Sequence, residues 1–507
     1  MNFNIPALTP EFYLTTLPVL SLCVGALIAM LQGVSRRLGG ENAVFAVVVL
    51  SLAVSLAAAV IYSPAVETSY LNGGYLAGVL ARFGQTLILI IALTVVLLFR
   101  STFLHDRFLR GEITALYLMI VTGMLVTVAS EDLVTLFVGL ELSSIGLYAL
   151  VGYLNPSRRS QEGAIKYFVL GSFAAALLLF GFALLYVATG SLRLSEISQA
   201  APKLLDHNWV RLGVVFSLVG LSFKLALAPF HLWAPDTYEA APTGLTALMA
   251  TTVKAMILVL VARFFAGSLA SVYHVWLPAL MFAATVSMIL GNIMALVQTS
   301  LKRMLAYSSI AHSGYMAIAI CAIGGGTGSF PIAAVLYYLI GYTIISLGAF
   351  GVLMWLENQE NDNLILDDIT GLAKKHPWAA LAMAVFMFSF AGMPPTVGFI
   401  GKFFVFNAAI TNQLYGLVII GVIGSSISLF YYLRVIVRMY MVEPVKVAVP
   451  LAPLRSLVVT GILAVAVLAN LALGTLFPET TMKWMVNTSK EVAASPLKTS
   501  ATGNISH

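Results

Sequence analysis

Five ionisable side chains lie inside apolar runs of this 507-residue chain, and their types could move protons. A charged side chain at the centre of a bilayer costs about 2.5–3.5 kcal/mol on insertion scales, so it usually faces a protein interior or a wet cavity and marks an ion route. Burial disfavours the charged form of a lysine, whereas a nearby carboxylate favours it. Changing their separation or hydration therefore moves a proton on or off the lysine. The five are Glu141, Lys166, Lys224, Lys254 and Lys402.

Each position also has a structural interpretation. Glu141 is either a proton carrier that pairs with a buried lysine or a carboxylate that bonds a neighbouring helix. Lys166 is either part of the route or an interfacial lysine paired with Glu162, four residues earlier. Lys254 lies too deep in its apolar run for its side chain to reach the surface easily. The depth of Lys254 therefore favours a role in the proton route over a surface position.

The other two lysines lie beside predicted helix breaks. Lys224 precedes Pro229, which cannot donate a helical hydrogen bond. Lys402 follows a stretch, 392–401, that holds two prolines and three glycines. A broken helix is tolerated in a membrane only where protein or a water-filled cavity surrounds it. Two such spans in the two halves of a chain predict an inverted-repeat transporter with sites near the midplane. The alternative for Lys224 is that its side chain reaches the membrane surface, near Trp233 and Asp236.

Two histidines add groups that change charge near neutral pH, His231 and His312. Each alone is as well explained as a hydrogen-bonded core histidine. Their company with the lysines favours a proton relay.

The composition excludes several classes of protein. The chain is 60% hydrophobic and 9% charged, with a mean hydropathy of +0.96, whereas soluble domains carry about 25% charged residues. A soluble enzyme, a nucleic-acid binder and a disordered protein are therefore excluded. Two cysteines, Cys23 and Cys321, are too few for an iron–sulfur cluster. We expect no cofactor and no metal in this chain.

Long continuous apolar runs predict an all-α polytopic membrane protein of about fourteen transmembrane helices rather than a β-barrel. The predicted units are the first three helices at 1–110, two inverted five-helix repeats at 111–270 and 271–441 (spans 4–8 and 9–13), and a last helix with its tail at 442–507. The polar stretch 357–377 is expected to be a solvated cytoplasmic connector. The fourteen spans lie near 13–33, 42–62, 80–99, 114–130, 132–154, 163–189, 209–231, 243–265, 274–298, 303–322, 331–356, 376–411, 415–440 and 454–477.

Basic residues predict the orientation. Lys and Arg are more frequent in the loops after odd-numbered spans than in the other loops and the tail. By the positive-inside rule, the odd-span loops are cytoplasmic and both termini lie on the outer, periplasmic side.

Several motifs together resemble one known family. They are Gly-Leu-Glu-Leu at 139–142, Glu-Gly-Ala-Ile-Lys-Tyr-Phe at 162–168, the stretch 223–242, Leu-Lys-Arg-Met-Leu-Ala-Tyr-Ser-Ser at 301–309 and Gly-Phe-Ile-Gly-Lys-Phe at 398–403. Over residues 110–440 the chain resembles subunit N of the proton-pumping NADH–quinone oxidoreductase, respiratory complex I, in the antiporter-like subunit family. The lysine at 402 favours subunit N over its sister subunit M, which typically has glutamate there.

The resemblance implies a role for each candidate. Glu141 pairs with Lys224 to gate proton input, and Lys166 modulates that pair. Lys254 is the central relay, helped by His231 and His312, and Lys402 releases protons toward the outer side.

The resemblance also implies where the cofactors lie, which partners the chain has and which membrane holds it. Flavin, iron–sulfur clusters and quinone belong to partner subunits. The partners are neighbouring antiporter-like and small membrane subunits, membrane lipid and protons, without nucleic acid, in the inner (plasma) membrane.

Three hypotheses follow. The first is a proton-translocating subunit of this oxidoreductase, coupled to quinone reduction in other subunits. The second is a cation/proton antiporter (Mrp-like) subunit, and the third is a structural membrane scaffold with vestigial charges.

Overall fold

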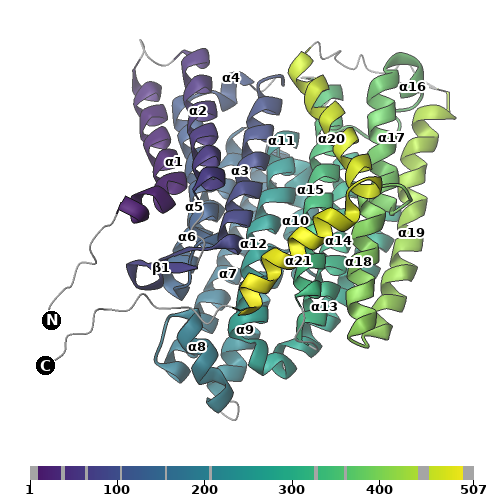
Figure 1. Cartoon of the computed structure of the whole chain (residues 1–507). Coiled ribbons are helices and arrows are strands. Elements are labelled where there is room, and N and C mark those ends of the chain that lie inside the picture. Colours follow the sequence, from purple (N-terminus) through teal and green to yellow (C-terminus); the bar gives the residue numbers. More distant parts are fainter. Residues whose placement is uncertain are drawn as a thin grey trace, which may run out of the picture.

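The computed structural model describes residues 10–35, 40–62, 67–102, 105–154, 157–204, 208–324, 329–358, 362–443 and 456–494. Figure 1 shows this part of the chain as a bundle of long helices that run side by side, with one small hairpin. Twelve of the described helices are long and apolar enough to cross a membrane. The two other predicted spans, 209–231 and 376–411, are each interrupted. The all-α polytopic architecture is therefore confirmed.

The N-terminal part holds three long helices and a β-hairpin, whose strands pair antiparallel with Thr68 opposite Ala77. Its spans begin and end within a few residues of the predicted positions. The elements are α1 (Pro10–Val34), α2 (Glu41–Ile61), β1 (Thr68–Tyr70), η1 (Leu71–Gly73), β2 (Tyr75–Ala77), α3 (Val79–Phe99) and α4 (His105–Phe108).

The middle part follows with the first interrupted span. Its helices pack closely where glycines face each other: a Cβ on Gly123 would lie 2.5 Å from the Gly139 carbonyl oxygen, so α5 and α6 could not approach as they do with a larger residue there. The elements are α5 (Gly111–Val128), α6 (Leu133–Tyr153), α7 (Arg158–Thr189), α8 (Leu194–Ala200), η2 (Ala201–Leu204), α9 (Asn208–Lys224), α10 (Trp233–Ala240), α11 (Thr243–Leu248), η3 (Met249–Val253), α12 (Lys254–Val261) and η4 (Ala262–Ser268).

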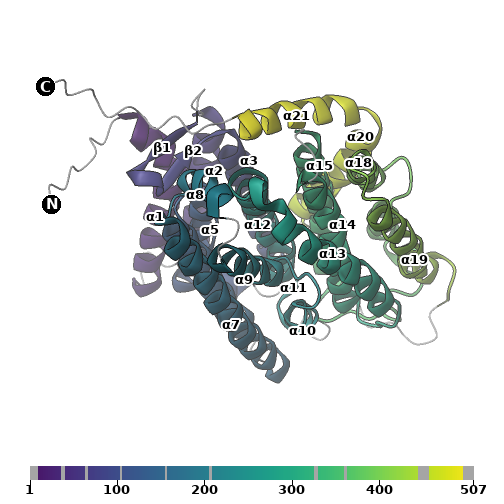
Figure 2. The same cartoon turned by 90° about the horizontal axis from the view of Figure 1, so that it is seen from below.

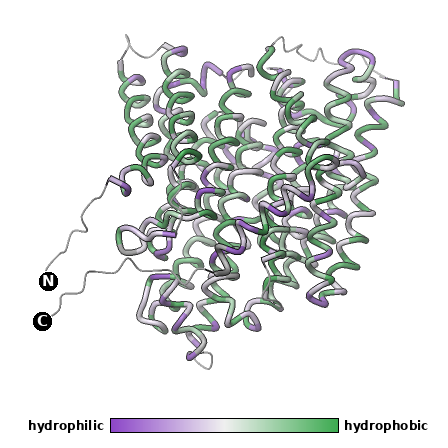
Figure 3. Tube along the Cα trace, in the orientation of Figure 1, coloured by the Kyte–Doolittle hydropathy of each residue, from purple (hydrophilic) through white to green (hydrophobic). Residues whose placement is uncertain are grey.

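The last part holds the second interrupted span and ends on an amphipathic helix, α21, which lies across α15 and α3 at the edge of the bundle (Figure 2). Figure 3 shows hydrophilic residues along this helix, whereas most other helices are hydrophobic along their length. The elements are η5 (Ala270–Val272), α13 (Tyr273–Leu296), α14 (Leu301–Gly324), α15 (Phe330–Leu356), α16 (Leu372–Lys375), α17 (Pro377–Ala391), α18 (Val397–Thr411), α19 (Tyr415–Tyr440), α20 (Leu457–Thr475) and α21 (Pro478–Ala494).

Two membrane segments form the centre of the molecule. The most apolar windows of α14 and of the continuous segment Thr243–Phe265 are entirely buried by protein, whereas the window of α20 is 22% buried. Viewed from below, α12 and α14 lie inside the bundle and α7, α19 and α21 at its edge (Figure 2). Polar side chains on α12 and α14 therefore meet protein rather than lipid.

The first interruption lies between α9 and α10. The sequence predicted a break near Pro229, but α9 already ends at Lys224. Proline removes a hydrogen bond and its ring clashes with the carbonyl four residues earlier, here that of Leu225, so the helix stops before that residue. Other helices satisfy the freed backbone groups: Ser287 Oγ on α13 accepts from the Ala228 amide (2.8 Å), and Trp233 Nε1 donates to the Phe223 carbonyl (2.8 Å).

The second interruption lies between α17 and α18, as predicted. Gly392 has φ +79°, a conformation that only glycine adopts easily. Asn470 on α20 secures the gap, because its Oδ1 accepts from Ser389 Oγ (2.9 Å) and from the Val397 amide (3.2 Å). At both breaks, side chains of neighbouring helices thus bond backbone groups that the helix no longer satisfies.

Other expectations on organisation remain predictions, namely the unit boundaries, the inverted relation of the two repeats and the side of the membrane on which each terminus lies. Five of the basic residues on which the orientation rests lie outside the described residues: Arg36, Arg37, Lys446, Arg455 and Lys498.

Candidate functional site: a buried chain of lysines

The first polar group of the site joins α6 to the end of α9. Lys224 Nζ lies 3.4 Å from Glu141 Oε1 and donates to Ser144 Oγ at 2.5 Å and to the Tyr148 hydroxyl at 3.5 Å. The side chain of Lys224 is 3% exposed and that of Glu141 18%. A buried ion pair is stable only when hydrogen bonds compensate the lost hydration, and the two hydroxyls supply them. The expected pairing of Glu141 with Lys224 is present.

The second group surrounds Lys254, which directly follows the π-helical turn η3. Its Nζ donates to the Ser309 carbonyl at 2.6 Å and to Ser313 Oγ, and it lies 5.1 Å from the centre of the Tyr342 ring. Ser313 Oγ also bonds the Leu225 carbonyl (2.6 Å), in the residue after Lys224. Ser313 therefore links Lys254 to the first break.

His312 lies one residue before Ser313 on α14 and is buried. Its Nδ1 is 2.7 Å from the Tyr338 hydroxyl and its Nε2 is 3.2 Å from the Tyr432 hydroxyl. Both ring nitrogens thus have partners, and each partner is a hydroxyl that can donate or accept. This geometry satisfies a core histidine and also suits a relay.

The third group surrounds Lys402 at the second break. Its Nζ donates to the Phe390 and Ala391 carbonyls (3.0 and 3.1 Å) and to Ser425 Oγ (2.9 Å). These are carbonyls at the end of α17, which have no helical partner because the helix stops there. A Cβ on Gly392 would lie 2.9 Å from Cδ of Lys402, so this glycine also leaves room for the lysine.

Helix α14 connects the second and third groups. Ser309 and Ser313 contact Lys254, His312 follows, and the ring centre of Tyr315 lies 5.1 Å from Lys402 Nζ. His312 and Ser313 lie three and four positions after Ser309, and Tyr315 lies three after His312, so each pair shares neighbouring positions on the helix surface. Hydroxyls, imidazole and amines can each take up and release protons, so the arrangement can pass a proton between the two lysines once water completes the gaps.

Two predicted residues lie apart from this chain. His231 is buried in the first break, but no hydrogen bond joins it to Glu141 or the described lysines. Lys166 has a side chain that is 44% exposed, with Nζ 2.6 Å from Glu162 and 2.9 Å from Asp236. The contact with Glu162 agrees with the interfacial interpretation, and Lys166 does not touch Glu141 or Lys224.

Sequence reasoning missed the hydroxyls that complete the chain. The spacing of Ser309, His312 and Ser313 on one helix was a usable signal. Ser144 and Tyr148 lie three and seven residues after Glu141 on the same helix, a spacing that was a second usable signal. The others come from distant segments and had none: Tyr338, Tyr342, Ser425 and Tyr432.

The structure corrects the placement of Glu357. It was expected on a solvated connector, yet its side chain is 7% exposed and lies 3.7 Å from Lys302 Nζ. The cause is the fold of the connector, since Leu364 and Thr299 carbonyls bond the Leu301 and Leu366 amides and so lay it over the start of α14.

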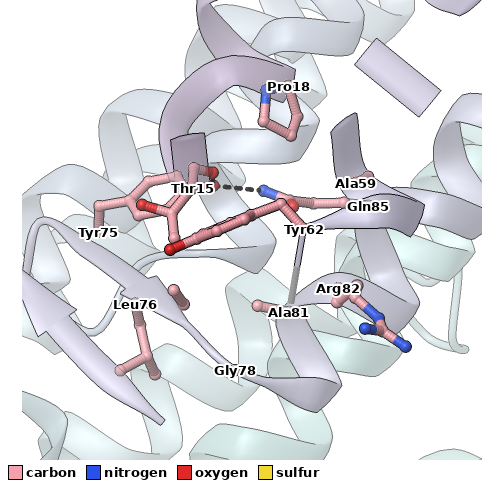
Figure 4. Close-up of a pocket in the computed structure, with 11 residues that line it drawn as sticks. Thr15, Pro18, Ala59, Tyr62, Tyr75, Leu76, Gly78, Ala81, Arg82 and Gln85 are labelled. Atoms are coloured by element: carbon pink, nitrogen blue, oxygen red, sulfur yellow. Dashed lines mark hydrogen bonds between the residues drawn. The ribbon is translucent and has the colours of Figure 1, made fainter. Parts of the chain in front are cut away.

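Two cavities in the described part of the protein are lined by none of the candidate site residues. A cavity of about 20 Å³, room for about one water, lies between α1, α2 and the hairpin (Figure 4). There the Tyr75 hydroxyl donates to the Thr15 carbonyl (2.6 Å) and accepts from Gln85 Nε2 (3.2 Å). A second cavity of about 190 Å³ beside Pro229 is lined mainly by apolar residues of α9, α13 and the break.

Among the described residues, one trio brings possible metal ligands within 4.8 Å of one another, Glu41, His105 and Asp106. It lies partly exposed at the start of α2 and on α4, and no contact joins it to the described lysines of the site. We assign no metal to it.

Comparison with known proteins places this architecture in a family. Residues 130–428 match the model described as NADH:quinone oxidoreductase/Mrp antiporter, TM. The chain is 44% identical over 372 residues to NADH-quinone oxidoreductase subunit N 2 of Roseiflexus castenholzii, covering 72% of this chain and 74% of that one. The chain belongs to the NADH:quinone oxidoreductase/Mrp antiporter family of membrane proteins.

Within that family it groups with subunit N of NADH-quinone oxidoreductase. It is similar to a chain of respiratory complex I from Thermus thermophilus, with a TM-score of 0.77, 31% identity and coverage of 92% of this chain and 98% of the other. A chain of the Mrp complex from a Dietzia species shares the fold, with a TM-score of 0.81, 19% identity and coverage of 96% and 97%.

Proposed function

We propose that this chain is a proton-translocating membrane-arm subunit of an NADH–quinone oxidoreductase, moving protons through its buried Glu, Lys and His side chains while quinone is reduced in other subunits. One observation carries the proposal: Lys224, Lys254 and Lys402 are 3%, 2% and 4% exposed, and each Nζ contacts polar groups inside the bundle. A purely structural scaffold has no need for three such costly groups in its interior.

The first step takes place at Glu141 and Lys224. A carboxylate near an ammonium stabilises its charge, so separating the two releases the proton of Lys224 more easily. Ser313, which bonds both Lys254 and the backbone next to Lys224, is placed to carry the connection onward. Translocation against 100 mV takes about 2.3 kcal/mol per charge, which is of the order of one buried pair formed or broken.

The later steps follow α14. Lys254 is the central relay, with His312 between it and Lys402, and His231 assists from the first break. Lys402 is the terminal donor toward the outer side, and Lys166 modulates the Glu141–Lys224 region from the interface. In this proposal the loop-rich face that holds Lys302, Lys374 and Arg438 is cytoplasmic, and both termini are periplasmic.

The redox groups belong to partner subunits in this proposal. The relatives are named for NADH and quinone, and this chain offers too few cysteines to ligate a cluster. Flavin, iron–sulfur clusters and quinone are therefore assigned to other subunits of the assembly in the plasma membrane, among them neighbouring antiporter-like and small membrane subunits.

The test is substitution of Lys224 or Lys254 by alanine in the intact complex. Each variant is expected to lose oxidoreductase activity that is coupled to pumping, while the amount of assembled complex stays near normal. Normal coupled activity in both variants would contradict the proposal. Loss of assembly with a Glu141→Gln variant, without any effect on coupling in what assembles, would favour the scaffold instead.

A cation/proton antiporter (Mrp-like) subunit is the second candidate, because the fold is also similar to that of the Mrp complex chain. Purification of the native assembly separates the two. Co-purifying flavin and iron–sulfur proteins support the oxidoreductase, and their absence supports the antiporter.

A further inference from the structure

A second buried charge cluster lies at the end of the bundle, apart from the chain of lysines. Glu357 caps the C-terminus of α15, where its Oε1 accepts from Thr243 Oγ1 at 2.5 Å and lies 3.7 Å from Lys302 Nζ. Lys302 is 3% exposed and also donates to the Ala241 carbonyl at 3.4 Å. The cluster therefore joins the starts of α11 and α14 to the end of α15.

Burial raises the pKa of Glu357 to about 7, against the opposing effects of the Lys302 charge and the Thr243 hydrogen bond. The charge of Asp362 on the connector adds to the increase. These are the groups that face Glu357 from α14, from α11 and from the connector. A carboxyl that is half protonated near neutral pH can both accept and release a proton there.

The cluster lies at the head of two segments that lead to Lys254. Thr243 begins the continuous helical segment that carries Lys254, and α15 packs against α11 and η3 along the way. Tyr342 on α15 lies beneath Lys254, and its hydroxyl donates to Ser309 Oγ at 2.8 Å. The same two segments thus touch Glu357 at one end and Lys254 at the other.

Helix α15 carries hydroxyls on the face that runs from Glu357 to Tyr342. Ser346 lies eleven positions before Glu357, which is about three helical turns or 16 Å, so the two share a face. The hydroxyl oxygens of Ser346 and Thr343 are buried and have no hydrogen-bond partner in the described part of the chain. Buried polar groups are normally bonded to protein or to ordered water, so these two are places where water would bind. Phe350 shares the face, so a continuous line of water has to pass beside its ring.

We propose that Glu357 is a proton-loading residue for Lys254: it takes a proton from water at the loop-rich face and passes it along the face of α15. The inference rests on the proposed function and extends it. On loading, an O–H bond forms at the carboxylate as a hydronium ion becomes water. On transfer, that bond breaks, an N–H bond forms at the neutral Nζ of Lys254, and the carboxylate returns to its pair with Lys302.

The test uses the intact complex in vesicles. Glu357→Gln keeps an oxygen for Thr243 but cannot titrate, and it is expected to lower the proton translocation rate roughly 100-fold, the lower end of the range for loss of a proton-transfer group. Glu357→Asp is expected to restore most of the rate. Asp367→Asn is the matched control, since Asp367 is an exposed acid on the same connector that pairs with Arg438, and it should leave the rate unchanged.

A pH profile separates proton loading from a structural role. Lys302→Met removes the positive charge beside Glu357, which raises the pKa of that carboxyl further, so the fall of the translocation rate at alkaline pH should move to higher pH. A translocation rate for Glu357→Gln equal to that of the parent across pH would overturn the inference. If Glu357→Gln does not assemble, the Lys302→Met profile decides, and an unshifted profile overturns the inference.

Lys254→Ala distinguishes the two levels of the proposal. If Lys254→Ala abolishes translocation and Glu357→Gln does not lower it, only the loading role fails. If Lys254→Ala also has no effect, the proposed function itself fails.

Discussion

The two broken helices place a lysine in similar positions but surround it differently. Lys224 at the first break has a carboxylate partner, Glu141. Lys402 at the second break contacts two carbonyls and one hydroxyl, and α14, α15, α17, α18 and α19 contain no acidic residue at all. The first break thus holds a compensated charge and the second break an uncompensated one.

This difference suggests different roles for the lysines at the two breaks. A compensated ammonium can stay charged until its carboxylate moves away, whereas an uncompensated ammonium in a low-dielectric interior readily gives up its proton. The first break is therefore suited to holding a proton and the second break to releasing it.

The largest expected effect comes from removing the terminal lysine. Lys402→Met keeps most of the volume but cannot carry a proton, so proton translocation by the reconstituted complex should fall by about 100-fold or more. The measurement is acidification of vesicles during NADH oxidation. Lys203→Ala, at an exposed position, is the control. If the Lys402→Met complex acidifies vesicles normally, Lys402 is not part of the proton route.

A smaller effect is expected from removing the carboxylate. In Glu141→Gln, Lys224 keeps Ser144 and Tyr148 as partners but loses the charge that holds its proton. Translocation should fall by roughly tenfold, less than for a lost lysine. The ratio of the two effects tests the difference between the two breaks. An effect of Glu141→Gln as large as that of Lys402→Met would contradict different roles for Lys224 and Lys402.

Adding a carboxylate beside Lys402 tests whether the lack of one is what lets this lysine release its proton. In Ser425→Asp, an acid replaces the hydroxyl that lies 2.9 Å from Lys402. The new pair should hold the proton on Lys402, so turnover should slow several-fold while the complex remains assembled. Ser425→Asn has a similar size without the charge and serves as the control. A Ser425→Asp complex that turns over faster than the Asn variant would contradict the release role.

The supports of the two breaks should matter about equally for stability. Ser287→Ala removes the acceptor of the Ala228 amide, and Asn470→Ala removes that of the Val397 amide. Each leaves a buried donor unsatisfied, which costs about 1–3 kcal/mol. Thermal unfolding of the purified complex should show similar decreases for both, and an unchanged melting temperature for either would mean that its break is supported in another way.

The smallest effect is expected at the interface. Lys166 is half exposed in its contacts with Glu162 and Asp236, and pairs of this kind contribute about 0–1 kcal/mol. Lys166→Ala should change coupled activity less than twofold if the lysine is interfacial. A larger loss, measured as NADH-driven vesicle acidification, would support the modulating role that the family resemblance implies.

Much of the fold could be predicted from the sequence because lipid imposes strong rules. Long apolar runs predicted the spans, and proline and glycine inside such runs predicted both breaks. The end of α9 at Lys224 was placed too late, because a proline disturbs the helix one turn before its own position.

The site could be predicted from the sequence only for ionisable residues, because placing them in an apolar membrane segment costs free energy. Lysines and a glutamate in apolar runs stand out, whereas serines and tyrosines do not, so Glu141 was predicted as a partner of Lys224 but the hydroxyl partners of Lys224 and Lys402 were not. Glu357 shows the converse error. Its polar neighbours in sequence indicated solvent, but the connector folds over the start of α14 and buries it against Lys302.

The number of protons moved per NADH oxidised tests the central claim most directly, measured in vesicles for the parent complex, Lys254→Ala and the exposed control Lys203→Ala. We expect Lys254→Ala to lower this number or to stop coupled turnover altogether, and Lys203→Ala to leave it unchanged. An unchanged number at normal turnover in the Lys254→Ala complex would contradict a proton route through this chain.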